Sequence, residues 1–223
     1  MNALLRYQAD LLLRSQRWLP PIILYAVFLG VGVQSGQPVL DSLGYTAAAL
    51  LPVAAWLVRI CVTVEPPAAR ACTAAAVGPG RAHLARLLVA LLAAAALGTA
   101  ATVVVTLISD PVTSDHQTRV PLLPSGVAGL LATPACALLG TAVGALTNWP
   151  VLRSPGRAVP AMLLAALLSV VATGSPAQAA VSGLVAGSQS GTVPVPLLPL
   201  VAAAVLAAAA AAVACALTSR RSP

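Results

Sequence analysis

Residues 87–109 read LLVALLAAAALGTAATVVVTLIS, an apolar run without a charged side chain. A helix crosses the roughly 30 Å hydrocarbon core of a bilayer with about 20 such residues, because each residue advances it by about 1.5 Å. The whole chain has the same character, since 59% of its 223 residues are hydrophobic and only 8% are charged. A soluble domain carries about 25% charged residues. The sequence therefore predicts an integral membrane protein.

Six segments have the length and composition of membrane-spanning helices. They cover residues 19–39, 43–64, 87–109, 122–146, 158–173 with some extension, and 197–217. The stretch 177–186 is too short to cross a bilayer and suits an external or re-entrant segment before the last span. The expected fold is an all-α membrane protein with six transmembrane helices in one domain, residues 19–217.

The two ends of the chain lie outside this domain. In residues 1–18, Leu4, Tyr7 and Leu11 recur at helical spacing between charged positions, which predicts a short amphipathic helix at the cytoplasmic membrane surface. An ordinary charged anchor before the first span is the alternative. No signal-peptide cleavage site is apparent, so we expect this segment to stay in the mature chain. Residues 218–223 form a predicted cytoplasmic tail.

The basic residues are distributed unevenly, and all 12 of them are arginines. One predicted side of the membrane holds Arg6, Arg14, Arg17, Arg59, Arg70, Arg81, Arg86, Arg153, Arg157, Arg220 and Arg221. Only Arg119 falls in the loops of the other side. By the positive-inside rule, both termini face the cytoplasm of a multi-pass plasma-membrane protein. Because the net charge of +7 is not gathered in a patch, nucleic acid is not an expected partner.

Few residues suit catalysis or metal binding. The chain has two histidines, five carboxylates and four cysteines, without the spacing of a metal site or a catalytic site. The absence of lysine excludes the phosphate-binding loop G-x-x-x-x-G-K-[ST], whose lysine reaches the β- and γ-phosphates. We therefore expect no catalytic residue, no bound metal and no cofactor in this chain, and any ATP is used by a partner subunit.

The connection EPPAARACTAAAVGPGR, residues 65–81, is the most informative soluble segment. Its alanines favour a helix, the prolines at 66 and 67 suit the first turn, and Gly-Pro-Gly at 78–80 suits the end. A rigid helix between two spans can transmit motion to a partner. A capped surface helix that merely shortens the connection is the alternative, and both interpretations stay open.

Two glycines in the fourth predicted span, Gly140 and Gly144, have G-x-x-x-G spacing, which lets two helices approach closely. They are candidates for helix packing. In a sequence so rich in small residues, such spacing also arises by chance. Dimerisation through this motif is therefore one possibility among others.

The segments RYQADLLLRSQRWLPPIILYAVFLG (residues 6–30) and TVEPPAARACTAAAVGPGRAHLARLL (residues 63–88), with the six-span topology, resemble the compact permease subunits of type-2 ABC exporters of actinobacteria. The resemblance implies ATP-driven export by alternating access. It also implies two kinds of partner, an ABC ATPase subunit and a second permease, identical or homologous. In this family the connection between spans two and three contacts the ATPase, which makes Glu65, Arg70 and Arg81 candidates for the ATPase-facing region. The alternative function is a non-transport membrane scaffold for interaction or immunity.

The orientation of the chain can be tested by labelling in intact cells. After the four native cysteines are replaced, Asn2→Cys should stay unlabelled by a membrane-impermeant maleimide, because the N-terminus is predicted to be cytoplasmic. Gln117→Cys, beside the lone Arg119, should react and serves as the positive control. Reaction at residue 2 and protection at residue 117 would reverse the orientation.

Overall fold

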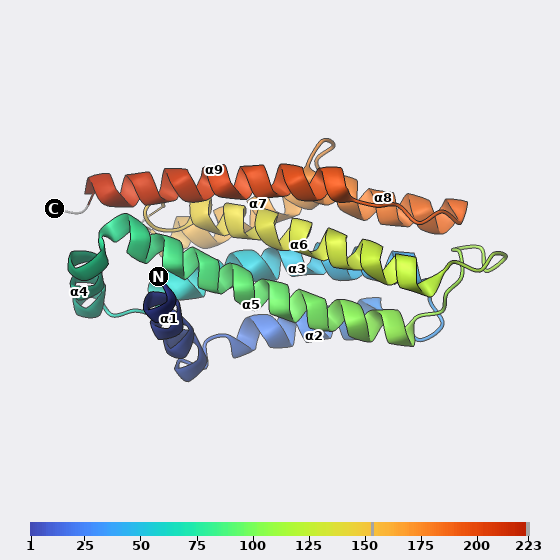
Figure 1. Ribbon diagram of the computed structural model, residues 1–223, viewed down its shortest axis with the longest axis horizontal. Coiled ribbons are helices and arrows are strands. Elements are labelled where there is room, and N and C mark those ends of the chain that lie inside the picture. Colours follow the sequence, from blue (N-terminus) through green and yellow to red (C-terminus); the bar gives the residue numbers. More distant parts are fainter. Residues whose placement is uncertain (153, 222–223) are drawn as a thin grey trace.

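The computed structural model describes residues 1–152 and 154–221, and the regular elements in these residues are helices (Figure 1). In chain order they are α1 (Asn2–Arg14), α2 (Leu19–Gly32), α3 (Val39–Thr63), α4 (Pro67–Val77), α5 (Pro79–Ile108), α6 (Leu122–Thr147), α7 (Pro155–Val171), α8 (Pro176–Ser190) and α9 (Leu197–Arg221). The predicted all-α class is confirmed. Arg153, counted above among the flanking arginines, and residues 222–223 of the expected tail lie outside the described residues.

Among the described residues, four helices are long and apolar enough to cross a membrane: α3, α5, α6 and α9. Together, α7 and α8 are also long and apolar enough for one crossing, which gives a fifth if they are taken as one broken span. Their axes are bent by 43° at the short break between them. A bend of this size does not reverse the chain, and α8 continues away from α7 along the bundle (Figure 1). These apolar helices are those of a membrane protein.

The first span is shorter than the sequence indicated. We expected residues 19–39 and 43–64 as separate spans, but α2 stops at Gly32 after 14 residues and α3 already begins at Val39. Gly36 has a φ of +87°, which breaks the helix between them. The backbone amide of Val39 then donates a hydrogen bond of 3.0 Å to the carbonyl of Asp110 at the end of α5.

The segment expected at 177–186 belongs to a longer helix. α8 has 15 residues, and its side toward the bundle is buried. The hydroxyl of Ser188 donates a 3.0 Å hydrogen bond to Asp41 at the start of α3. Polar residues such as Gln178 and Gln189 lower the hydropathy at both ends of α8, which made the apolar run look shorter than the helix. The segment expected at 177–186 is thus the middle of a 15-residue helix that packs along α3.

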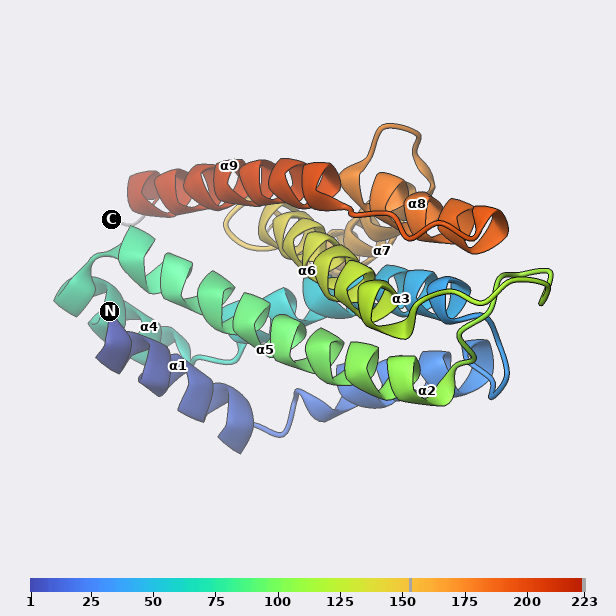
Figure 2. The same cartoon turned by 45° about the vertical axis from the view of Figure 1, so that its right-hand side comes forward.

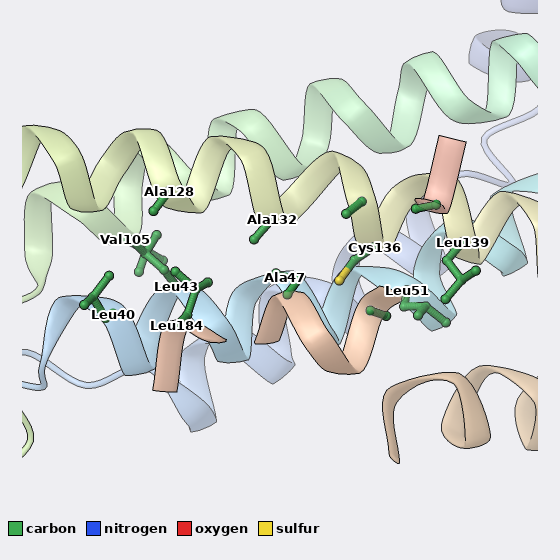
Figure 3. Close-up of a cluster of buried hydrophobic side chains, with 14 of the residues drawn as sticks. Leu40, Leu43, Ala47, Leu51, Val105, Ala128, Ala132, Cys136, Leu139 and Leu184 are labelled. Atoms are coloured by element: carbon green, nitrogen blue, oxygen red, sulfur yellow. The ribbon is translucent and has the colours of Figure 1, made fainter. Parts of the chain in front are cut away.

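The bundle is built around α3, which lies between α5, α6 and α8 in both views (Figures 1 and 2). It contributes side chains to a hydrophobic cluster that also contains residues of α5, α6, α7, α8 and α9 (Figure 3). This cluster includes Leu40, Leu43, Ala47 and Leu51 of α3, Ala128, Ala132, Cys136 and Leu139 of α6, Val105 of α5 and Leu184 of α8. The N-terminus, α4 and the C-terminal end of α9 gather at one end of the bundle, called here the α4 end.

The glycine pair in α6 packs against α3 within the chain. A Cβ added to Gly140 would collide with the carbonyl oxygen of Leu51, and one added to Gly144 would lie 2.7 Å from the Cβ of Val58. Both glycines therefore let α6 approach the main chain of α3 closely. Because this face of α6 is occupied by α3, the G-x-x-x-G motif is used inside the chain.

Gly140→Ala should destabilise the protein although alanine is the better helix former. Its methyl group collides with main chain that cannot rotate away, and overpacking of this kind costs about 1–3 kcal/mol. In Gly30→Ala, on α2, the added methyl group meets nothing within 4 Å. This control should gain up to about 1 kcal/mol of helix propensity. Thermal unfolding in detergent compares the two variants, and a raised melting temperature for Gly140→Ala would refute the close packing.

Candidate functional site

A buried carboxylate lies at the α4 end of the bundle, in the turn between α3 and α4. The side chain of Glu65 has an exposed fraction of 0%. Burying a charged group costs free energy unless it is paired and hydrogen-bonded. The groups that contact this carboxylate are therefore the ones that make its burial possible.

The charge of Glu65 is balanced by Arg86 on α5. The Arg86 side chain is only 2% exposed, and its Nε and Nη2 atoms both donate to Oε2 of Glu65, the Nε bond being 3.1 Å long. Hydrogen bonds between charged groups are roughly twice as strong as those between neutral ones. This ion pair fixes the first part of α5 to the turn that follows α3.

Neutral donors complete the coordination of the carboxylate. Oε1 accepts hydrogen bonds from the hydroxyls of Tyr7 at 3.3 Å and Thr73 at 3.1 Å, and Oε2 accepts one from the Gln8 amide at 3.4 Å. Tyr7 and Gln8 belong to α1, and Thr73 belongs to α4. The Glu65 cluster, defined as Tyr7, Gln8, Glu65, Arg70, Thr73 and Arg86, thus joins α1, α4 and α5 to the end of α3.

Arg70 holds α4 from a second direction. Its Nη2 atom donates a 3.1 Å hydrogen bond to the main-chain oxygen of Glu65, and its guanidinium carbon lies 5.6 Å from the ring centre of Trp149 after α6. The same indole ring meets His83 of α5 edge to face, with ring centres 6.0 Å apart. Burial lowers the pKa of Arg70, and the nearby positive charge of Arg86 lowers this pKa further. The cation–π contact extends the attachment of α4 to the end of α6.

Two of the three residues proposed for the ATPase-facing region point into the protein. The Glu65 side chain is buried and its oxygens already accept hydrogen bonds within the chain, so a partner cannot contact it. Arg70 is half-buried against Trp149. Arg81 is exposed but lies in the first turn of α5, because α4 ends at Val77 and Pro79 begins the next helix. A role of Glu65 toward an ATPase would therefore be indirect, through the helices that its carboxylate joins.

The exposed side of α4 carries small residues. Between Pro67 and Val77, which are exposed at its two ends, it consists of Ala68, Ala71, Cys72, Ala75 and Ala76. The helix itself is fixed at both ends, by Pro66 and Pro67 at its start and by Gly78, with a φ of +86°, at its end. A partner can therefore contact the α4 backbone closely along this side.

The sequence interpretation missed the residues that pair with Glu65. Arg86 was assigned to topology alone, and Tyr7, Gln8 and Thr73 were given no role with this carboxylate. One signal was present, because Arg86 is followed directly by the apolar run 87–109 and needs a partner there. Asp10 and Glu65 lie in the two segments, residues 1–18 and 65–81, that were expected on the same side of the membrane as Arg86. The contributions of α1 and α4 required the three-dimensional arrangement.

The opposite end of α3 carries a second carboxylate. Oδ2 of Asp41 accepts hydrogen bonds from the hydroxyls of Ser114 at 2.8 Å and Ser188 at 3.0 Å. The backbone amide of Ser114 also donates to the carbonyl of Ser188 at 3.1 Å. These bonds connect the start of α3, the loop after α5 and the end of α8. They involve hydroxyl groups rather than a cation.

Comparison with known proteins finds no matching family model, no matching curated protein and no matching solved structure. Among the described residues, no three His, Cys, Asp or Glu side chains gather as metal ligands would. Both oxygens of the Glu65 carboxylate accept hydrogen bonds from side chains of other helices, which suits a structural joint between helices. Function is therefore inferred from this joint and from the helices that it connects.

Glu65→Gln should strongly destabilise the α4 end, because it leaves the buried charge of Arg86 without a counter-charge. Breaking a buried pair by removing one partner costs about 3–5 kcal/mol. The double variant Glu65→Gln/Arg86→Met removes both charges and should recover most of this loss. Asp10→Asn changes an exposed carboxylate on α1 and should alter stability by less than about 0.5 kcal/mol. Unfolding in detergent measures all three, and equal effects at residues 10 and 65 would argue against the ion pair.

Proposed function

We propose that this chain is the permease subunit of an ATP-driven ABC transporter in the plasma membrane, acting as an exporter. It pairs with a second copy or a homologous permease and moves its substrate by alternating access. The observation that carries the proposal is the Glu65 cluster, which ties the exposed helix α4 to α1, α3 and α5. The resemblance of residues 6–30 and 63–88 to type-2 exporter permeases supports the same function.

ATP binding is assigned to a separate ATPase subunit, because this chain has no lysine for a phosphate-binding loop. In the proposal the ATPase docks on the exposed side of α4. A displacement of α4 then reaches α5 through the Glu65–Arg86 pair and α1 through Tyr7 and Gln8. The buried charges resist separation, since an unpaired charge in this position is costly. The joint therefore transmits movement instead of absorbing it.

The membrane arrangement in this proposal has six crossings. α2 makes the first, and at 14 residues it requires local thinning of the bilayer or help from residues 33–38. α3, α5 and α6 follow, the broken pair α7–α8 makes the fifth crossing, and α9 makes the last. Both termini, α1 and α4 then face the cytoplasm, on the side that is rich in arginine.

A native cysteine provides the test of docking at α4. Cys72 is exposed there, Cys61 and Cys136 are buried, and Cys215 is replaced by alanine to leave one reactive thiol. A bulky maleimide at Cys72 should abolish the substrate-stimulated ATP hydrolysis of the purified permease–ATPase complex, because it obstructs the contact. The matched variant Cys72→Ser should keep normal hydrolysis and resist the reagent.

Two results would count against this proposal. Full hydrolysis and transport with Cys72 quantitatively modified would place the ATPase contact elsewhere. An associated ATPase whose hydrolysis never responds to transport substrates would favour the alternative of a non-transport membrane scaffold.

A further inference from the structure

A groove lies between α5 and α9 on the side of the bundle, beginning near its α4 end. The two helices approach closely at this end, where a Cβ added to Gly80 of α5 would lie 2.9 Å from the hydroxyl oxygen of Ser219 on α9. Farther along they diverge, and α6 lies between them in both views (Figures 1 and 2). The divergence leaves a groove with a volume of about 480 Å³, whose floor includes Leu138 and Thr141 of α6.

The lining of this α5–α9 groove is apolar. Leucines within residues 84–91 of α5 form one wall, and alanines within residues 204–212 of α9 form the other. The Thr141 hydroxyl in the floor donates a 2.8 Å hydrogen bond to the carbonyl of Ala137, so it is satisfied within α6. The groove therefore suits a hydrocarbon chain better than a polar ligand.

The groove has the length of one membrane leaflet. Along α9 its lining extends from Ala204 to Cys215, which is about 16 Å at a rise of about 1.5 Å per residue. Half of the roughly 30 Å hydrocarbon core is about 15 Å. A partner helix that crosses the membrane would pack along the whole core, whereas an acyl chain of a phospholipid occupies only its own leaflet. The length therefore favours an acyl chain over a second membrane helix.

Basic residues lie at the α4 end of the groove. Arg81 is exposed, and it precedes Leu84 by three residues and Leu88 by seven, so it lies on the side of α5 that lines the groove. Arg220 is exposed at the end of α9. Within the described residues, neither arginine forms an ion pair. Both positive charges are therefore available to an anion from outside the chain.

Carboxylates do not neutralise this end of the molecule. Three of the five lie at the opposite end of α3 or in the loop after α5: Asp41, Asp110 and Asp115. Glu65 is buried in its pair with Arg86, and Asp10 forms no ion pair within the part of the chain that the structure describes. Basic pockets between membrane helices on the cytoplasmic side bind the headgroups of anionic lipids. The charge and the apolar groove thus match the two parts of such a lipid.

We propose that the α5–α9 groove, with Arg81 at its mouth, binds a phospholipid that has an anionic headgroup. One acyl chain lies along the alanines of α9. The phosphate lies beside Arg81, whose long side chain extends from the hydrocarbon to the headgroup region and donates from a planar guanidinium. This inference rests on the membrane placement within the proposed function, but it goes beyond that function because it requires neither the ATPase nor transport.

Lipid titration of the purified full chain in detergent tests the site. Dioleoylphosphatidylglycerol is anionic and should raise the melting temperature in a saturable way, because it binds the folded state. Dioleoylphosphatidylcholine has the same acyl chains without the net charge and should raise it much less. Inorganic phosphate should leave it unchanged. Equal stabilisation by the two lipids would refute the role of charge, and equal stabilisation by phosphate alone would identify a site for free anions; either result rejects the proposal.

Two neighbouring alanines of α9 test whether the acyl chain occupies the groove. Ala208 is exposed and lines the groove, whereas Ala209 is exposed outside the lining. Ala208→Leu should fill the groove and raise the dissociation constant of phosphatidylglycerol about tenfold or more. Ala209→Leu adds the same side chain and should leave the constant unchanged. Native mass spectrometry measures both constants, and equal constants for the two variants would show that the lipid binds elsewhere.

A second pair of variants tests the headgroup contact. Arg81→Gln should raise the dissociation constant of phosphatidylglycerol about fivefold, the effect of one basic residue near an anionic lipid. Arg157→Gln removes the same charge from an exposed position at the start of α7 and should have no such effect. Equal weakening by both variants would indicate attraction by the net charge alone and would contradict a built site.

Cys215 reports on other occupants of the groove. It lines the groove and is half-buried, and it becomes the single thiol when Cys61, Cys72 and Cys136 are replaced. Cross-linking of Cys215 to a second polypeptide in native membranes would show that protein fills the groove and would reject the lipid. Selective lipid binding by a chain whose associated ATPase never responds to substrate would retain this site while rejecting transport. Normal stimulated hydrolysis by a chain that does not distinguish the two lipids would do the opposite.

Discussion

The buried ion pair between Glu65 and Arg86 is the interaction on which the α4 end of the molecule depends. Neither side chain reaches solvent, so each charge is tolerable only in the presence of the other. Tyr7, Gln8 and Thr73 supply the remaining hydrogen bonds to the carboxylate, and they come from α1 and α4. One acidic residue in a turn thereby determines where three helices lie. Apolar packing is weaker here, since no residue of α4 is fully buried.

The two ends of α3 are held by interactions of different strength. At the α4 end, a carboxylate is paired with a buried guanidinium and surrounded by donors. At the other end, Asp41 binds the hydroxyls of Ser114 and Ser188, and its second oxygen is buried without a partner in the described part of the chain. Between them, Gly140 and Gly144 bring α6 into contact with the main chain of α3. The bundle therefore has a rigid middle, one firmly tied end and one end held by weaker neutral donors.

Length and hydropathy were sufficient to predict the all-α class and the approximate positions of α3, α5, α6 and α9. They misjudged α2, because the turn at Gly36 is not visible in the hydropathy of residues 19–39. The predicted segment was also shorter than α8, because the polar residues on one side of this helix lower the average hydropathy at its ends. The proline and glycine signals identified α4 well. The Glu65 cluster could not be predicted, since its members are up to 79 residues apart in the sequence and their pairing depends on how α1 and α5 pack.

Hydrogen exchange at the α4 amides tests most directly whether the Glu65–Arg86 pair fixes this helix. An 11-residue helix is marginal in isolation, so its protection must come from its attachments. In Glu65→Gln, exchange in α4 should accelerate by at least about tenfold relative to the unmodified chain, whereas exchange in the core of α6 should stay the same. Equal protection of α4 in both proteins would contradict the account, because the helix would then be held by contacts that do not involve the ion pair.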